Sequence, residues 1–112
     1  MKCIIAGSRT ITDKKLVLKA IEDSKIEITE IISGHANGVD KIGEQISYDL
    51  GIDLVIFPAN WKKWGKSAGP IRNKKMLERA EAAIIVHNCS SGSVHMAKIA
   101  REKGINVYEY KL

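Results

Sequence analysis

Apolar residues follow two patterns that alternate along the chain. Five short runs are predominantly apolar, as in buried strands, and between them apolar residues recur every three or four positions, as in amphipathic helices. The runs predict strands at about 2–6, 30–32, 53–57, 82–86 and 105–109, and the periodic segments predict helices at about 13–23, 39–50, 70–80 and 90–103. This alternation is typical of a parallel sheet with helices on both faces.

The order of these elements predicts an α/β fold, a single Rossmann-like, three-layer domain over residues 1–112. Because crossovers between parallel strands are right-handed, we expect a doubly wound, five-stranded parallel sheet with strand order 3-2-1-4-5. The helix at 39–50 has a clear apolar face. We expect its apolar residues Val39, Ile42, Ile46 and Leu50 to be buried. We expect Lys41, Glu44 and Asp49 to be largely exposed.

Ligands of doubly wound sheets bind outside the carboxyl ends of the strands, beside the first strand. Four loops are expected at that edge, at 7–9, 33–40, 58–73 and 88–93, and each contains glycine or serine. Four polar loops at one edge favour a shared binding site. The predicted ligand-binding residues are Gly7, Ser8, Arg9, Ser33, Gly34, Ala36, Gly38, Asp40, Trp61, Gly69, Arg72, Asn73, Ser91, Gly92 and Ser93.

These loops offer the chemistry of a nucleotide-phosphate site. Gly34 and Gly38 allow the backbone to approach a ligand closely, and the free N–H groups of a first helical turn favour an anion. Arg9 and Arg72 offer guanidinium groups for phosphate contacts, and Trp61 offers a ring that can stack on a base. The same residues are also compatible with ligand-free turns, solvated arginines and an indole folded onto the core.

Asp40 is the candidate for acid–base chemistry. It falls in the first turn of the helix at 39–50, where a carboxylate offsets the helix dipole. Alternatively, it accepts a ribose hydroxyl or takes part in acid–base catalysis. The sequence leaves both roles open.

The charge of the chain suits anionic partners. Its formal net charge is +5, from 18 basic and 13 acidic residues, which fits ligands from mononucleotides to nucleic acid. Basic pairs at 14–15, 62–63 and 74–75 are typical of solvated faces, although together they could attract a nucleic-acid backbone. The charge therefore does not choose between these ligands.

Hydropathy and cysteine usage predict a cytoplasmic protein. No apolar run approaches the length of a membrane span, and the N-terminus lacks the features of a signal peptide. Two thiols in this context, Cys3 and Cys89, are expected to be reduced. His87, Cys89 and His95 lack a fourth metal ligand, so no metal and no cofactor is expected.

Four segments carry a resemblance to a known group of proteins. They are Gly-Ser-Arg at 7–9, Ser-Gly-His-Ala-Asn-Gly-Val-Asp at 33–40, Pro-Ala-Asn-Trp at 58–61, and the most specific one, Ala-Gly-Pro-Ile-Arg-Asn-Lys-Lys-Met at 68–76. They resemble the SLOG superfamily (the Smf/DprA–LOG group), in particular its small YspA-type class of bacteria and phages. The resemblance implies a Rossmann-like fold and a nucleotide-related ligand. Members include enzymes that release a base from a nucleotide, sensors of NAD-derived signals and a DNA-binding branch.

The chain departs from the superfamily pattern at the fourth loop. Many members have Gly-Gly-x-Gly-Thr there, whereas this chain has Ser-Ser-Gly-Ser at 90–93. A phosphate could still meet the N–H of Gly92 and the hydroxyl of Ser93. The base-releasing branch has a glutamate shortly after that loop, at the position of Met96, which cannot act as an acid or base. Asp40 would then have to supply the carboxylate.

Taken together, these observations predict a domain that binds a nucleotide or a nucleotide-derived ligand, of ADP-ribose or cyclic-nucleotide type, to sense or sequester a signalling nucleotide. One alternative is a hydrolase that cleaves the N-glycosidic bond of a nucleotide, and another is a nucleic-acid-binding module. We also expect a homo-oligomer, because so small a domain with a long tryptophan-bearing loop can complete its site with a neighbour.

Overall fold

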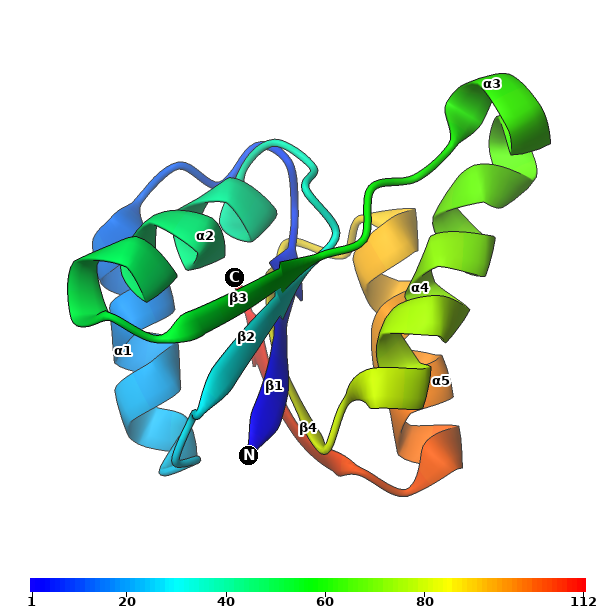
Figure 1. Cartoon of the computed structure of the whole chain (residues 1–112). Helices are drawn as coiled ribbons and strands as arrows, with labels where there is room; N and C mark the ends of the chain where they lie inside the picture. Colours follow the sequence, from blue (N-terminus) through cyan, green and yellow to red (C-terminus); the bar gives the residue numbers. More distant parts are fainter.

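The computed structural model describes residues 1–112 as an α/β domain (Figure 1). Its five strands form one parallel sheet of order β3-β2-β1-β4-β5, which confirms the predicted topology. The strands are β1 (Lys2–Gly7), β2 (Glu30–Ser33), β3 (Asp53–Ile56), β4 (Ala82–His87) and β5 (Asn106–Lys111). The helices are α1 (Lys14–Ser24), α2 (Val39–Leu50), α3 (Trp61–Trp64), the 3-10 turn η1 (Gly65–Ser67), α4 (Ala68–Arg79) and α5 (Ser91–Lys103).

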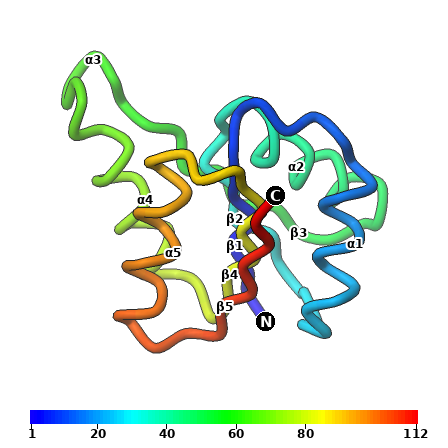
Figure 2. Tube along the Cα trace, turned by 180° about the vertical axis from the view of Figure 1, so that it is seen from behind, coloured from blue at the N-terminus to red at the C-terminus, as the bar shows by residue number.

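The sheet lies between two helical layers, with α1 and α2 on one face and α4 and α5 on the other (Figure 2). Side chains alternate between the two faces of each strand, so the sheet contributes to two separate cores. Ile5 and Ile84 pack beneath α1 and α2, and Ile4 and Ile85 pack beneath α4 and α5. The inner strands β1, β2 and β4 are therefore largely buried on both faces, whereas the edge strands β3 and β5 are partly exposed.

The chain leaves β1 and β4 toward opposite faces of the sheet. The helix after β1 packs in one core and the helix after β4 packs in the other. These two strands are neighbours, with Gly7 level with Val86 at their carboxyl ends. Loops that diverge to opposite faces from neighbouring strands leave room between them, as expected at a topological switch point.

The predicted burial of α2 is partly wrong. Val39, Ile42 and Ile46 are buried as expected, but Leu50 is 62% exposed. Leu50 is the last residue of the helix, directly before the turn at Gly51. Glu44 was expected in solvent, yet its side chain is only 15% exposed because it turns toward the polar side chains of the 33–38 loop.

Two local predictions also require correction. The 58–69 stretch is not irregular throughout, because Asn60 accepts a hydrogen bond from the N–H of Lys63 and so begins α3. The following helix starts at Ala68 instead of Pro70. At α1 the capping side chain is Asp13, the first residue of the segment predicted at 13–23. No helix combines the length and apolar character needed to cross a membrane.

Candidate functional site

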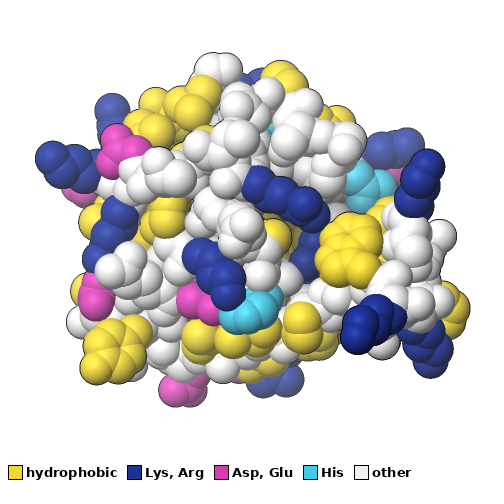
Figure 3. Space-filling model, turned by 90° about the horizontal axis from the view of Figure 1, so that it is seen from above, with side chains coloured by type: hydrophobic (Ala, Val, Ile, Leu, Met, Phe, Trp, Pro, Cys, Tyr) yellow, Lys and Arg dark blue, Asp and Glu magenta, His cyan; other side chains and the backbone are white.

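A cavity of about 800 Å³ opens at the carboxyl edge of the sheet, between the loops after β1 and β4 and the start of α4. Seen from this side, basic side chains lie around the hollow beside a hydrophobic one (Figure 3). The cavity brings together most of the predicted ligand-binding residues. Those that line it are Gly7, Ser8, Arg9, Ala36, Asp40, Trp61, Gly69, Arg72, Asn73, Ser91, Gly92 and Ser93.

Three predicted residues lie beside or behind this cavity. Gly34 lines a smaller adjoining hollow of about 290 Å³, which shares Arg9, Trp61 and Arg72 with the main one. Gly38, with a φ of +78°, packs against the backbone of the loop after β1, where a Cβ would meet the Ser8 carbonyl oxygen at 2.3 Å. Ser33 is fully buried. Gly38 and Ser33 thus shape the loops and do not line the cavity.

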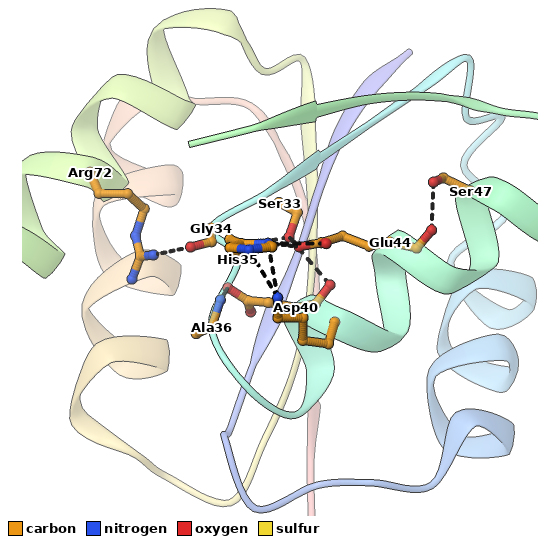
Figure 4. Close-up of polar contacts among 9 residues, drawn as sticks. Ser33, Gly34, His35, Ala36, Asp40, Glu44, Ser47 and Arg72 are labelled. Atoms are coloured by element: carbon orange, nitrogen blue, oxygen red, sulfur yellow. Dashed lines mark hydrogen bonds and ion pairs between the residues drawn. The ribbon is translucent and has the colours of Figure 1, made fainter. Parts of the chain in front are cut away.

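Arg72 joins α4 to the 33–38 loop beside the cavity. Its Nη1 donates to the Gly34 carbonyl oxygen at 2.6 Å (Figure 4). Its Nε donates to Oδ1 of the neighbouring Asn73 at 2.9 Å. Burial lowers the pKa of Arg72, Asp40 opposes this shift, and the nearby positive charge of Arg9 adds to it. Two guanidinium groups that repel each other at one cavity form a favourable place for an anion.

Asp40 is the buried carboxyl group of the site. It is 4% exposed, is the second residue of α2, and its Oδ2 accepts a hydrogen bond from the Ala36 N–H at 3.3 Å. Burial raises the pKa of Asp40 from 3.8 to about 6, against the opposing effects of the Ala36 N–H and the Arg72 charge. A carboxyl group with such a pKa can hold or release a proton near neutral pH.

The raised pKa of Asp40 predicts a specific dependence of stability on pH. Between about pH 4 and pH 6 the folded protein holds a proton that the unfolded chain has released, so the free energy of unfolding falls as the pH rises through this window. A rise from 3.8 to about 6 corresponds to roughly 3 kcal/mol. Asp40→Asn removes the buried charge and keeps an acceptor oxygen for the Ala36 N–H.

We therefore expect Asp40→Asn to raise the free energy of unfolding by at least about 1 kcal/mol near pH 8 and to have little effect near pH 4. Denaturant unfolding of both proteins at the two pH values checks this. A variant that is less stable near pH 8 would show that pairing with Arg72 outweighs the cost of burying the carboxylate.

Serine and asparagine side chains join the loops after β1 and β4. Ser8 Oγ donates to Asn88 Oδ1 at 2.8 Å, accepts from the Asn88 N–H at 3.0 Å and lies 2.9 Å from Ser90 Oγ. Ser90 Oγ in turn donates to Ser93 Oγ at 2.8 Å. No side chain caps α5, so the N–H groups of its first turn remain available beside the cavity.

The 33–38 loop is held from behind by Glu44. Ser33 Oγ donates to Glu44 Oε2 at 2.7 Å, and His35 Nδ1 lies 2.9 Å from the same carboxylate (Figure 4). His35 adopts a positive φ of 62°. A non-glycine residue in this conformation costs energy unless its surroundings fix it. Glu44 therefore positions the loop on which Ala36 reaches the cavity and Gly34 reaches the adjoining hollow.

Sequence reasoning missed several residues of the site. Asn88 and Ser90 lie in a predicted loop but were not among the predicted ligand-binding residues. His95 and Met96, which also line the cavity, lie one turn into α5. A spacing of four residues from Ser91 and Gly92 puts His95 and Met96 on the same face of the helix, which is the signal that could have found them. The other missed lining residues are Ala6, Thr10, Lys66, Pro70 and Met76.

Fold and site together define a Rossmann-like domain of the SLOG type. Residues 1–64, more than half of the chain, match the family described as the YspA, cpYpsA-related SLOG family. The chain belongs to this family, which confirms the resemblance found in the sequence.

A solved structure has the same fold. DNA processing protein A (DprA) from Streptococcus pneumoniae matches with a TM-score of 0.79 and 20% sequence identity over 96% of this chain. At that identity the likeness concerns the fold alone. The chain spans 49% of the DprA chain, about half its length. No curated protein is similar enough in sequence to count as a match.

Proposed function

We propose that this domain binds a nucleotide or a nucleotide-derived ligand, of ADP-ribose or cyclic-nucleotide type, in the carboxyl-edge cavity. The observation that carries the proposal is the convergence of Arg9, Arg72 and the uncapped start of α5 on one cavity of about 800 Å³. Guanidinium groups and helix N-termini both favour phosphate oxygens. Family membership supports a nucleotide-related function of this kind.

The remaining lining residues suit the other parts of a nucleotide. Trp61 borders the cavity with its side chain half exposed, and the Arg9 guanidinium lies 5.7 Å from the centre of its ring. A base can stack on such a ring. Asp40 can accept a ribose hydroxyl. A domain that binds in this way, without chemistry, would sense or sequester a signalling nucleotide.

Titration calorimetry with AMP, ADP, NAD and ADP-ribose tests the proposal. We expect at least one of these compounds to bind with a stoichiometry of about one per chain and to be recovered unchanged after incubation. Absence of heat for all four, with the protein folded, would contradict it. Chromatography of the incubated nucleotides distinguishes a binding protein from an enzyme.

A second candidate function is cleavage of the N-glycosidic bond of a nucleotide. The buried position of Asp40 at the cavity and its pKa of about 6 favour this alternative, because such a carboxyl group can take up or deliver a proton. If the protein releases a free base, Asp40→Asn should abolish the release and leave binding of the nucleotide in place. Release that survives in Asp40→Asn would exclude Asp40 as the catalytic group.

A third candidate function is nucleic-acid binding through α3, which projects from the body of the domain (Figure 1). It exposes Trp61 and Trp64 beside Lys62 and Lys63, and the Lys63 Nζ lies 4.9 Å from the centre of the Trp64 ring. Exposed aromatic rings between basic side chains suit single strands. This function would be favoured if affinity for an oligonucleotide falls steeply as the salt concentration rises and if Trp64→Ala no longer binds the oligonucleotide.

Assembly into a homo-oligomer stays a prediction. Tyr48, Leu50 and Ile56 expose large apolar side chains, of which Tyr48 is 88% exposed, on the adjoining elements α2 and β3. Light scattering at micromolar concentration should give a mass above that of one chain. Leu50→Lys should shift the mass toward the monomer if this surface forms the contact. A monomeric parent protein would contradict the prediction.

A further inference from the structure

A chain of hydrogen bonds runs from Arg72 on α4 to His95 on α5. Arg72 Nε donates to Asn73 Oδ1 at 2.9 Å, and Asn73 Nδ2 lies 3.3 Å from His95 Nδ1. Asn73 is 6% exposed, so its amide has few other partners, and all three side chains line the cavity. His95 is the only histidine among the lining residues.

The donor and acceptor properties of the three side chains fix the direction of these hydrogen bonds. A guanidinium can only donate hydrogen bonds, so the atom of Asn73 that faces Arg72 must be the carbonyl oxygen. The other end of that amide is then an NH₂ group, which donates to His95. His95 Nδ1 must accept, and in a neutral imidazole the proton therefore sits on Nε2. Arg72 thus fixes the tautomer of a ring two hydrogen bonds away.

We propose that His95 contacts the ligand as a neutral donor, with Nε2–H directed to an acceptor oxygen of the bound nucleotide. This inference rests on the proposed function. With Nδ1 engaged by Asn73, Nε2 is the ring nitrogen left for a ligand in the cavity that His95 lines. A fixed donor favours a ligand oxygen and disfavours a ligand N–H group at the same place, so His95 contributes selectivity by hydrogen-bond type. Asn73 is the positioning residue.

The tautomer can be measured without any ligand. In protein labelled with ¹⁵N-histidine, at a pH where the ring is neutral, long-range ¹H–¹⁵N spectra distinguish a protonated from an unprotonated ring nitrogen. His95→Gln assigns the signals among the three histidines. We expect protonated Nε2 and unprotonated Nδ1 in His95. A protonated Nδ1, or a mixture of the two tautomers, would overturn the inference.

Asn73→Asp is the matched variant, because it replaces the donating NH₂ group by an accepting oxygen at nearly the same volume. One carboxylate oxygen can still accept from Arg72, and the other now requires a donor. We expect Nδ1 of His95 to become protonated in this variant. An unchanged His95 tautomer in folded Asn73→Asp would show that Asn73 does not set it. If this variant does not fold, the spectrum of the parent protein still decides.

The ligand contact is tested by titrating the labelled protein with ADP-ribose, AMP and inorganic phosphate. The His95 Nε2 signal should shift with saturation, whereas the His87 signals should not move. His87 is a suitable control because it is fully buried and its ring nitrogens are held by Glu109 and the Cys89 N–H. A shift with inorganic phosphate assigns the oxygen to a phosphate group, and a shift seen only with the nucleotides shows that the contact requires the sugar or base to be bound as well.

Failure of this inference is distinct from failure of the proposed function. If backbone signals of Ser8, Arg9 and Gly92 shift on titration while His95 Nε2 does not, the cavity binds the nucleotide without His95, and the inference is wrong. If no cavity signal shifts with any of the three probes, the proposed function fails together with the ligand contact.

Discussion

Arg72→Ala should weaken nucleotide binding roughly thirtyfold or more, about 2 kcal/mol. Arg72 is half-buried at the cavity, so a phosphate that loses this partner keeps only Arg9 as a guanidinium partner there and one of its charge-assisted hydrogen bonds is lost. The substitution also removes the hydrogen bond to the Gly34 carbonyl oxygen that joins α4 to the 33–38 loop. Arg72→Lys should recover only part of the affinity, because an ammonium group lacks the planar fork of the guanidinium.

Calorimetry with the tightest-binding of the four nucleotides measures this effect. Arg9→Ala should cause a similar loss, whereas Lys62→Ala and Lys74→Ala, which change exposed side chains outside the cavity, should alter affinity only slightly at physiological salt. Folding of each variant is checked first by circular dichroism. If both arginine variants bind like the parent and a lysine variant fails, the binding site lies elsewhere. If all four variants lose affinity by similar small amounts, and binding weakens steeply with salt, the result would favour nucleic acid as the ligand.

Gly7→Ala should destabilise the fold by about 3 kcal/mol or more. A Cβ at this position would lie 1.9 Å from the Val86 carbonyl oxygen and 2.7 Å from Val39 Cγ2. That carbonyl accepts the N–H of Ser8 at 3.1 Å, where β1 ends beside β4. The clash therefore separates the two central strands where the cavity begins, and neither a backbone oxygen nor a packed valine can move aside cheaply.

Thermal unfolding of Gly7→Ala should show a Tm lower by roughly 15 °C. Gly92→Ala is the matched control, since nothing lies within 4 Å of its added Cβ and its φ is not in the left-handed region. It should change the Tm by a degree or two. Equal effects of the two substitutions would mean that β1 and β4 do not approach as closely as described.

The sheet could be predicted from the sequence because strands that are buried on both faces consist mainly of consecutive apolar residues. The runs around Ile4 and Ile84 have no polar interruption, and right-handed crossovers then restrict the strand order to very few solutions. Because the strands are parallel, the loops after their carboxyl ends were expected at one edge of the sheet. For that reason most of the predicted ligand-binding residues, including Arg9 and Arg72, line one cavity.

The parts that could not be predicted depend on pairwise geometry. Leu50 follows the apolar period of α2, but its burial requires a neighbour that periodicity does not reveal. Glu44 looked like a solvated residue because its partners, Ser33 and His35, lie on a loop some ten residues earlier. The hydrogen bonds from Arg72 to His95 cross between two helices, and no local sequence pattern records such a contact.

The central claim is that a nucleotide occupies the cavity at the carboxyl edge. A crystal structure of the protein soaked with ADP-ribose, or carrying a nucleotide retained through purification, tests it most directly. We predict phosphate density within hydrogen-bond distance of Arg9 or Arg72, and a base against Trp61. Nucleotide density at another surface, such as the shallow hollow between Lys2 and Arg79, with the carboxyl-edge cavity holding only water, would contradict the claim.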